Sequence, residues 1–419
     1  MPYLALEGVR VIDAATGVAG PFCAKLLADY GAEVIKVERP GTGDSSRATG
    51  PFPDDLRHPE KSGLFLHLNT NKRGVTLDLA NPAGRDLFRR LVRESDILVE
   101  SGPPGEMDSL GLGYQELAVS NPGLVMTSIT PFSQTGPHSG HEFTELTLFA
   151  TTGAMNREGI PVREPLKYGG ETAQYFAGNA AAAATMAASF GSLLSGRGQW
   201  IDISIQECMA GHPHQLSRRT AFAYAADDDA RQQPHTSFFS IVGEAYMVGT
   251  FRCKDGHVSI LPVGSSMWPN FVRMVARPDL LDNPRFRDPT VREQRHKELE
   301  AIFQPWLDAR TKEQVFEAAQ EAGLPCAPVL TVDQVMEDRH LVDRGYFTDI
   351  HHPDAGTLTY TGLPFHLSDV PREDQRPAPR LGQHNREVFG GMLGVGDDEM
   401  VALEAQMVLG ESGPIERTR

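Results

Sequence analysis

The chain has 419 residues, a length that predicts about two domains of roughly 150–250 residues each. Its 40% hydrophobic and 22% charged residues are typical of a soluble globular protein and exclude a disordered one. The 39 Lys and Arg residues against 55 Asp and Glu give a formal net charge of −16, which argues against a large nucleic-acid-binding surface because such surfaces need clustered positive charge. An anionic ligand would need a local cluster of Arg and Lys.

The first half of the chain alternates between strand and helix patterns. A β-branched run at 8–13 ends in an acid and precedes a loop of small residues at 14–20. Pro21 then begins an amphipathic stretch that Gly31 closes. Further strands are expected at 33–38, 73–78, 96–100, 124–129 and 198–204. Helices are expected at 84–93, with Asn81 as the cap and Pro82 as the first helical residue, and in the Ala-rich stretch 177–194. This alternation predicts an α/β fold with a doubly wound, Rossmann-like parallel sheet and right-handed crossovers.

A change of composition near residue 230 indicates a second domain. The loop at 225–234 is polar and ends in proline, so we expect a domain boundary there. The resulting division is a large α/β domain over 1–224, a smaller α+β domain over 235–347, and a C-terminal segment over 348–419 that returns to the large domain. Within the second and third parts, strands are expected at 244–248, 257–261 and 357–361, and helices at 292–310 and 311–322.

The cysteines and histidines indicate neither a disulfide framework nor a metal site. Cys23, Cys208, Cys253 and Cys326 are far apart and form no C-x-x-C pair, which favours a reducing cytoplasm. The histidine pairs at 212/214 and 351/352 lack a third ligand at metal spacing, so we expect them on the surface or in loops. The first residues lack the features of a signal peptide, and the stretch at 177–194 reads as an internal helix, so we expect a cytoplasmic protein without a membrane span.

The turn after the first strand raises the alternative of a dinucleotide site. A helix start after a glycine loop attracts phosphate, and Glu38 stands near where a ribose-binding acid would lie. The glycines read Gly17-x-x-Gly20 instead of G-x-G-x-x-G, and Arg39 directly follows the acid. We therefore disfavour NAD binding, and Gly17 and Gly20 need only permit a tight turn.

Four basic residues adjoin the expected strands. Lys36 and Arg39 flank the end of the second strand, and Lys72 and Arg73 stand at the start of the third. Ligands of doubly wound sheets collect near strand ends, so these side chains are candidates for binding a phosphate-bearing ligand. The alternative is that they are solvated surface residues.

Motifs along almost the whole chain then identify a resemblance. They are LEGVRVIDAATGVAGPFCAKLLADYGAEVIKVERPGTGD (6–44), NTNKRGVTLDL (69–79), SDILVES (95–101), LGLGY (110–114), TELTLFATTGAM (144–155), SGRGQWIDISIQE (195–207), DNPRF (282–286), AGLPCAPV (322–329) and APRLGQHNREV (378–388). The sequence resembles the class III CoA-transferases, a group that includes formyl-CoA transferase, carnitine CoA-transferase and α-methylacyl-CoA racemase. The resemblance implies a large and a small domain, two chains interlocked as a dimer, and coenzyme A or acyl-CoA as a substrate with no tightly bound cofactor.

The position of the family's nucleophile departs from the pattern. In active members an aspartate carboxylate attacks the acyl-CoA thioester, and a mixed anhydride and an aspartyl-CoA thioester follow. That aspartate stands just before the Ala-rich helix, and the matching residue in this chain is Gln174. A neutral amide is a weak nucleophile and forms no labile anhydride, so Gln174 is not expected to sustain covalent transfer, nor to act as the base of a racemase. Thr144 also stands where racemases have His.

Two nearby acids are secondary candidates. Glu171 lies three residues upstream of Gln174, with an uncertain reach to the same point, and is otherwise a solvated loop residue. Glu145 matches a position where relatives often carry an acid, and its alternative role is a structural hydrogen bond. We expect no metal at the site.

The resemblance also assigns CoA contacts, which are expected at Gly17, Val18, Arg39, Lys72, Arg73 and Ser101. Relatives commonly show Asn-Phe after the fourth strand and an Arg a few residues later, whereas this chain has Ser101-Gly102 and then Ser109. Losing a stacking aromatic ring and a cation should weaken CoA binding by ~1–3 kcal/mol each.

These departures lead to one preferred function and two alternatives. The preferred function is a class III CoA-transferase component in acyl-CoA and carboxylic-acid metabolism, with a degenerate site, acting with a related Asp-bearing subunit. The first alternative is a self-sufficient transferase, as a homodimer, that uses Glu171. The second is a non-catalytic acyl-CoA-binding or regulatory protein. No nucleic-acid or membrane partner is expected.

Overall fold

The computed structural model describes residues 4–155, 164–211, 249–261, 267–288, 291–292, 295–369 and 375–410. It divides the chain into two compact units. One unit comprises Met1–Glu158, Pro165–Ala225 and Gly345–Arg419, and the other comprises Gly159–Glu164 and Ala226–Arg344. The boundary loop expected at 225–234, the strand expected at 244–248 and the histidines at 212 and 214 lie outside the described residues.

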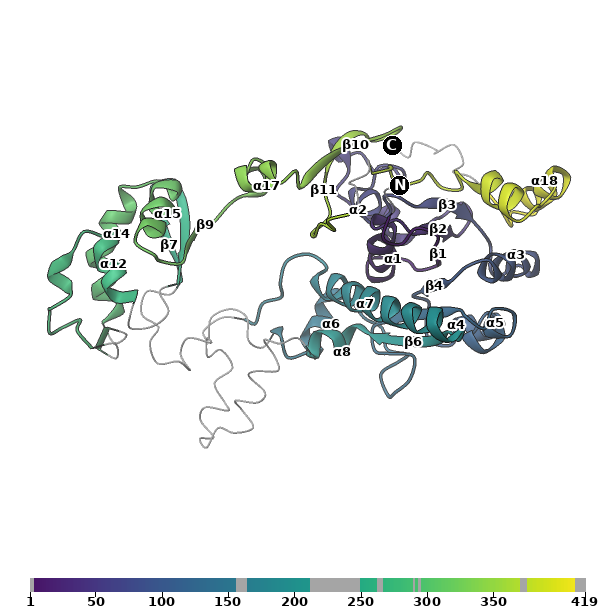
Figure 1. The fold of residues 1–419 in the computed structure, drawn as a ribbon, viewed down its shortest axis with the longest axis horizontal. Helices are drawn as coiled ribbons and strands as arrows, with labels where there is room; N and C mark the ends of the chain where they lie inside the picture. Colours follow the sequence, from purple (N-terminus) through teal and green to yellow (C-terminus); the bar gives the residue numbers. More distant parts are fainter. Residues whose placement is uncertain are drawn as a thin grey trace. The chain divides into compact units, whose positions relative to one another are not determined.

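The first unit contains the predicted parallel sheet (Figure 1). All of its strand pairs are parallel and their order is β3-β2-β1-β4-β5-β6. This order confirms the doubly wound α/β fold. The order reverses between β1 and β4, and ligands of such folds bind beyond the carboxyl ends of the strands at this position. The strands are β1 (Arg10–Asp13), β2 (Glu33–Glu38), β3 (Arg73–Thr76), β4 (Ile97–Glu100), β5 (Val125–Thr130) and β6 (Gln199–Ser204).

Helices cover both faces of this sheet, as the alternation of its buried residues requires. Val11 and Val99 belong to one hydrophobic cluster, whereas their neighbours Ile12 and Leu98 belong to another, because successive strand residues point to opposite faces. The first cluster includes residues from α1 (Ala19–Asp29), α6 (Glu145–Thr151), α7 (Thr172–Ser195) and α8 (Ile205–Ala210). The second includes residues from α3 (Pro82–Arg93), α4 (Glu106–Ser109), α5 (Tyr114–Ser120), the π-helix η6 (Arg386–Met392) and α18 (Asp397–Ala405).

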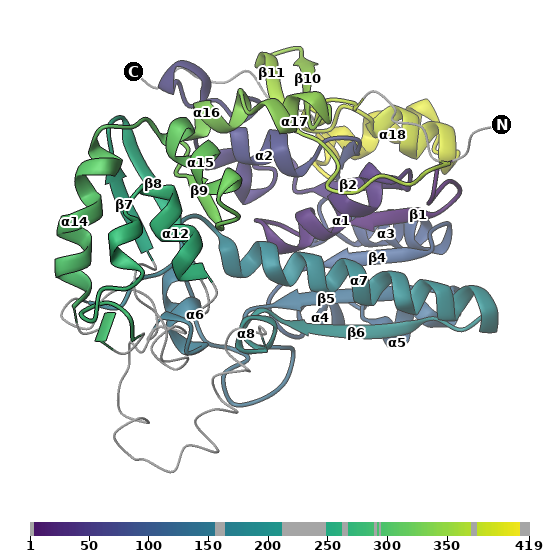
Figure 2. The same cartoon turned by 60° about the vertical axis from the view of Figure 1, so that its left-hand side comes forward.

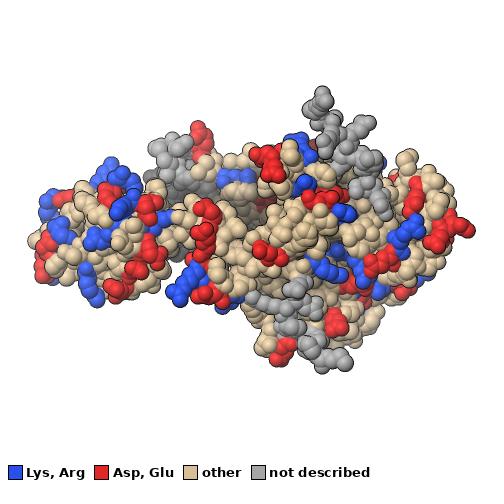
Figure 3. Space-filling model, turned by 90° about the horizontal axis from the view of Figure 1, so that it is seen from above, with Lys and Arg blue, Asp and Glu red and all other residues tan. Residues whose placement is uncertain are grey.

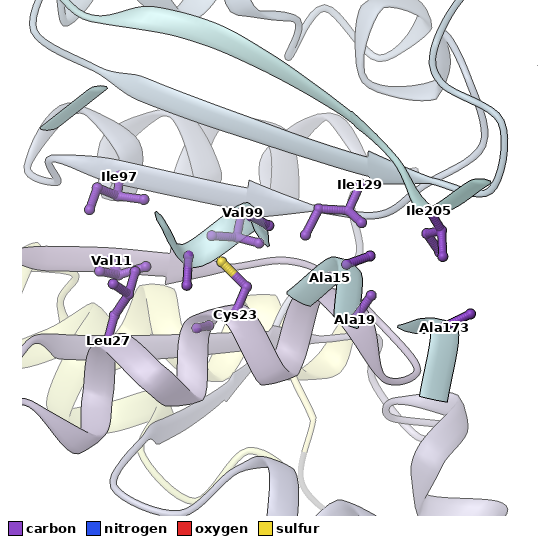
Figure 4. Packing of buried hydrophobic residues seen from close by; sticks show 14 of the residues in the cluster. Val11, Ala15, Ala19, Cys23, Leu27, Ile97, Val99, Ile129, Ala173 and Ile205 are labelled. Carbon is purple, nitrogen blue, oxygen red and sulfur yellow. The ribbon is translucent and has the colours of Figure 1, made fainter. Parts of the chain in front are cut away.

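Helices α1 and α7 pack closely through small residues (Figures 1 and 2). Ala173, Ala177 and Ala181 repeat every four residues along α7 and are fully buried, so they form one stripe along the helix. A Cβ atom added to Gly178 would lie 2.7 Å from the carbonyl oxygen of Ala19 in α1. Figure 4 shows Ala15, Ala19 and Cys23 in the same layer as Val99 of the sheet. The small side chains of α7 therefore allow it to approach α1 closely.

The C-terminal part of the first unit contains an antiparallel hairpin, of which the sequence predicted only one strand. Strand β11 (Gly356–Thr361) matches the expected strand, but β10 (Phe347–His352), with which it pairs, was not expected. His352 is buried on β10 and its Nδ1 accepts from the backbone N–H groups of Asp354 and Ala355, so its expected surface position was wrong. The remaining helical segments of this unit are α2 (Gly63–Leu68) and the 3₁₀ turns η1 (Ser45–Ala48) and η2 (Pro53–Asp55).

The second unit has its own core around a three-stranded antiparallel sheet, β7-β8-β9 (Figure 2). Its helix α15 begins after Thr311, whose side chain and that of Gln314 form a reciprocal capping box. The elements are β7 (Gly249–Cys253), β8 (Gly256–Ile260), α12 (Trp268–Met274), η5 (Pro278–Leu280), α14 (His296–Asp308), α15 (Lys312–Glu321), β9 (Cys326–Pro328), α16 (Val332–Met336) and α17 (Arg339–Asp343).

Two general observations complete the fold. Among the described helices, none is long and apolar enough to cross a membrane. Basic and acidic side chains are interspersed over the face drawn in Figure 3.

Candidate functional site

A pocket opens at the point where the strand order of the large sheet reverses. It has a volume of about 390 Å³ and lies beyond the carboxyl ends of β1 and β4. Two loops meet there, because the backbone N–H of Thr16 donates to Ser101 Oγ at 2.9 Å and that hydroxyl donates to the Thr16 carbonyl at 3.2 Å. The lining residues are Thr16, Gly17, Val18, Ala19, Gly20, Ser45, Ser46, Thr49, Leu64, Ser101, Ile129, Pro131, Phe143, Glu171, Gln174 and Ile205.

The first turn of α7 brings Gln174 and Glu171 to this pocket. Glu171 occupies the N-cap position of α7, and Gln174 is the third residue of the helix. Residues three apart on a helix lie on the same face, and the Gln174 Nε2 atom donates to Glu171 Oε2 at 3.0 Å. The carboxylate of Glu171 therefore reaches the same point as the Gln174 amide, which the sequence left uncertain.

Glu145 binds the backbone at the same end of α7. It is the first residue of α6, whose start Thr144 caps, and its Oε1 accepts the backbone N–H of Ala173 at 2.7 Å. The Glu145 side chain is 8% exposed, and its Oε2 has no hydrogen-bond partner among the described residues. Burial and the nearby charge of Glu171 raise the pKa of Glu145. The structure therefore assembles Gln174, Glu171 and Glu145 into one cluster at the N-terminus of α7.

Of the six residues expected to contact CoA, three line the pocket and three do not. Gly17, Val18 and Ser101 line the pocket. Gly17 has a φ of +79°, a backbone conformation that favours glycine, and its N–H donates to Asp44 Oδ1 at 3.0 Å. The exposed Arg39 follows β2 and is not among the lining residues.

Lys72 and Arg73 do not fit the expected contact with a phosphate. Lys72 is buried, and its ammonium donates to Asp13 Oδ2, the Pro21 carbonyl and Asn69 Oδ1, which uses all three of its N–H bonds. Arg73 forms an ion pair of 2.8 Å with Glu33, which is the first residue of β2. This pair therefore lies at the amino end of β2, away from the carboxyl ends of β1 and β4. Position beside a strand was therefore not enough to predict a ligand contact.

The acid on which the dinucleotide alternative relied, Glu38, is held by another side chain. Glu38 accepts from Arg47 Nε at 2.7 Å and from Arg47 Nη2 at 2.8 Å, a bidentate ion pair that is nearly fully buried. Its carboxylate is therefore not available to a ribose.

One acid beside the pocket was missed by the sequence reasoning. Glu100 ends β4 directly before Ser101 and is 4% exposed. Burial raises its pKa to about 7, although the Ser128 hydroxyl and the Gly102 N–H oppose the shift. The sequence did offer a signal for Glu100, because an acid at the carboxyl end of a strand is a candidate site residue where the strand order reverses. Among the described residues no group of three or more His, Cys, Asp or Glu is arranged to hold a metal ion.

Comparison with known proteins places this chain in a family. Residues 6–385 match the model of CoA-transferase family III. The chain is 31% identical over 409 residues to succinyl-CoA–D-citramalate CoA-transferase of Chloroflexus aurantiacus, with 97% of this chain and 99% of that protein covered. It is also 31% identical over 412 residues to the succinyl-CoA–L-malate CoA-transferase beta subunit of the same organism, covering 97% and 98%.

A solved structure agrees with this relationship. The CAIB/BAIF family protein from Brucella suis superposes with a TM-score of 0.80 and 27% sequence identity, over 93% of this chain and 99% of that one. The match of the family model over most of the length and the two curated relatives point to the same enzymatic family. The chain belongs to CoA-transferase family III.

Proposed function

We propose that this chain is a component of a CoA-transferase that moves CoA between carboxylic acids, and that a related subunit supplies the aspartate nucleophile. The observation that carries the proposal is the amide of Gln174, which lines the pocket at the N-terminus of α7 where the resemblance expects that aspartate. Transfer through an anhydride needs an anionic oxygen, and an amide has none. The pocket of this chain would then bind CoA or support its partner without forming the covalent intermediate.

The proposed assembly is a heteromer of two related chains, interlocked and cytoplasmic. The relative that carries the name beta subunit supports a complex with unequal chains. Four free cysteines support a reducing compartment. A homodimer is the alternative assembly.

Glu171 favours a second candidate, a transferase that is complete in itself. Its carboxylate lines the same pocket and lies 3.0 Å from the Gln174 amide. In this reaction a Glu171 oxygen attacks the thioester carbonyl and the CoA thiolate leaves, giving a glutamyl anhydride. The thiolate then attacks the glutamyl carbonyl and releases the first acid as its carboxylate. The second acid reverses these steps, takes the CoA and returns Glu171 to its free carboxylate.

The two candidates differ in what the purified chain does alone. Transfer of CoA from a panel of acyl-CoA donors to carboxylic acids is measured for the chain by itself and for the complex isolated from its source organism. Under the first candidate the chain alone is inactive, and Gln174→Ala and Glu171→Gln leave turnover of the complex within about threefold. Under the second, the chain alone turns over, and Glu171→Gln abolishes both turnover and a hydroxylamine-sensitive adduct. Glu404→Gln, at an exposed position on α18, is the control.

A third result would contradict both candidates. If neither the chain nor its complex transfers CoA, but the chain binds CoA tightly in calorimetry, the protein is an acyl-CoA-binding or regulatory protein. Loss of turnover on Gln174→Ala as large as the loss of a nucleophile would contradict the passive role of that amide.

A further inference from the structure

Four charged side chains lie buried beneath the loop that lines the pocket. They are the carboxylates of Asp13 and Asp44 and the ammonium groups of Lys36 and Lys72, and each residue is at most 2% exposed. Lys36 lies 2.7 Å from Asp44 and 3.7 Å from Asp13, and Lys72 lies 2.8 Å from Asp13. The four charges sum to zero, so this buried network offers no excess positive charge to a phosphate.

Each of the four groups holds the backbone of the loop at 14–21. The Ala15 N–H donates to Asp13 Oδ1 at 3.1 Å, and Lys36 donates to the Ala15 carbonyl. The Gly17 N–H donates to Asp44 Oδ1 at 3.0 Å, and Lys72 donates to the Pro21 carbonyl at 2.8 Å. The loop is thus fixed at three points along its length by charge-assisted hydrogen bonds, which are stronger than neutral ones.

Asp44 also joins this loop to a second segment of the pocket wall, at Ser46. Its Oδ1 accepts from the N–H and the hydroxyl of Ser46 at 2.8 Å each, and Ser46 lines the pocket as Gly17 does. Its other oxygen, Oδ2, pairs with Lys36. Burial opposes ionisation of Asp44, but the adjacent Lys36 charge holds the pKa of Asp44 below its usual value, so the carboxylate is charged.

Stability alone does not account for such a network. Replacing a buried ion pair by apolar side chains of similar volume is often neutral or stabilising, because the charges must be taken out of water. What an apolar substitute cannot do is direct hydrogen bonds to four chosen backbone groups. Loops rich in small residues, such as Ala14 to Gly20, lose much conformational freedom when ordered, and a ligand would otherwise have to order them.

We propose that Asp44, held by Lys36, is the positioning residue that sets two segments of the CoA pocket wall, at Gly17 and Ser46, before the ligand arrives, with Asp13 and Lys72 fixing the two ends of the loop. This inference rests on the proposed function in taking CoA as the ligand. It gives Lys36 and Lys72 a role in orienting backbone groups and leaves ligand contact to the loop itself.

The test compares two buried ion pairs of the same unit. Asp44→Asn keeps the shape of the side chain but removes the charge that Lys36 requires. Asp29→Asn is the control, because Asp29 pairs with Lys25 at 2.8 Å with both side chains 6% exposed, and neither residue lines the pocket. Binding of CoA to the full chain is measured by calorimetry, and exchange of the backbone amides at 14–20 is measured by hydrogen-deuterium exchange at matched global stability.

The expected result is that Asp44→Asn weakens CoA binding at least tenfold and speeds amide exchange at 14–20, whereas Asp29→Asn changes neither beyond twofold. A CoA affinity within twofold of wild type in Asp44→Asn, or equal weakening by Asp29→Asn, would overturn the inference. If Asp44→Asn does not fold, Ser46→Ala, which removes one contact of Asp44 in the same wall, is expected to weaken binding about threefold or more. If wild type binds no CoA, the premise that CoA is the ligand of this pocket fails, while unchanged exchange at 14–20 in Asp44→Asn overturns the positioning role separately.

Discussion

The side-chain amide of Gln174 donates a hydrogen bond to the carboxylate of Glu171 at 3.0 Å, and both groups line the same pocket. The contact follows from helix geometry, since the two residues are three apart at the start of α7. It orients a carboxylate toward the place where the family is expected to carry its nucleophile.

Gln174→Asp is expected to give the isolated chain CoA-transferase activity, because it places an anionic oxygen at the position where the resemblance expects the nucleophile. The neighbouring acids Glu171 and Glu145 should raise the pKa of the new carboxyl group, so activity should increase with pH. Turnover and a hydroxylamine-sensitive adduct are the measurements, with Gln174→Ala as the inactive control. A Gln174→Asp variant that binds CoA but forms no adduct would contradict the assignment of this position.

Glu145→Ala is expected to lower the free energy of unfolding by about 1–3 kcal/mol, because the backbone N–H of Ala173 loses its acceptor in a buried setting. Glu145→Gln retains an acceptor oxygen and removes a buried ionisable group, so its cost should be smaller. Urea denaturation of both variants checks the order. Equal destabilisation by the two substitutions would show that the charge of Glu145, and not its hydrogen bond, supports α7.

Gly178→Ala and Gly191→Ala form a matched pair on α7 with opposite expected signs. A Cβ atom at Gly178 would lie 2.7 Å from the Ala19 carbonyl, so this variant should lose about 1–3 kcal/mol through forced separation of α1 and α7. At Gly191 no atom lies within 4 Å of the added Cβ, and the variant should gain up to about 1 kcal/mol from helix propensity. Thermal unfolding distinguishes them. A stable Gly178→Ala variant would be incompatible with the close packing of these helices.

Glu100 should make stability fall as pH rises. Its pKa is about 7 in the folded chain against 4.5 for an unperturbed carboxyl group, so the folded state binds more protons between these values. The stabilisation is therefore present below pH 4.5 and is lost as pH rises through 7. Glu100→Gln cannot ionise, and its stability relative to wild type should increase by up to about 3 kcal/mol from pH 4.5 to 8. Urea denaturation of wild type and Glu100→Gln across this range checks the slope.

The strands and most helices were predictable from the sequence because their signals are local. Runs of β-branched residues bounded by glycine and proline marked β2 at its exact bounds of Glu33–Glu38. Asn81 before Pro82 marked the start of α3, where the Asn81 side chain accepts the Ala83 N–H. Strand β10 was missed, because its polar sequence becomes a strand only by pairing with β11.

The functional role of single side chains was decided by tertiary structure. Lys72 and Arg39 are both basic and both adjoin strands, but Lys72 is buried against three acceptors while Arg39 is exposed. Burial and partners depend on residues distant in the chain, such as Asp13 for Lys72, and no local pattern encodes them. The parallel α/β fold, the family resemblance and the amide at position 174 could be read from the sequence alone, since they reside in residue identity and periodicity. Only the tertiary structure brought Glu171 to that amide and Asp44 beneath Gly17, because hydrogen bonds between such groups exist only once the loops and helix ends converge beyond the same edge of the sheet.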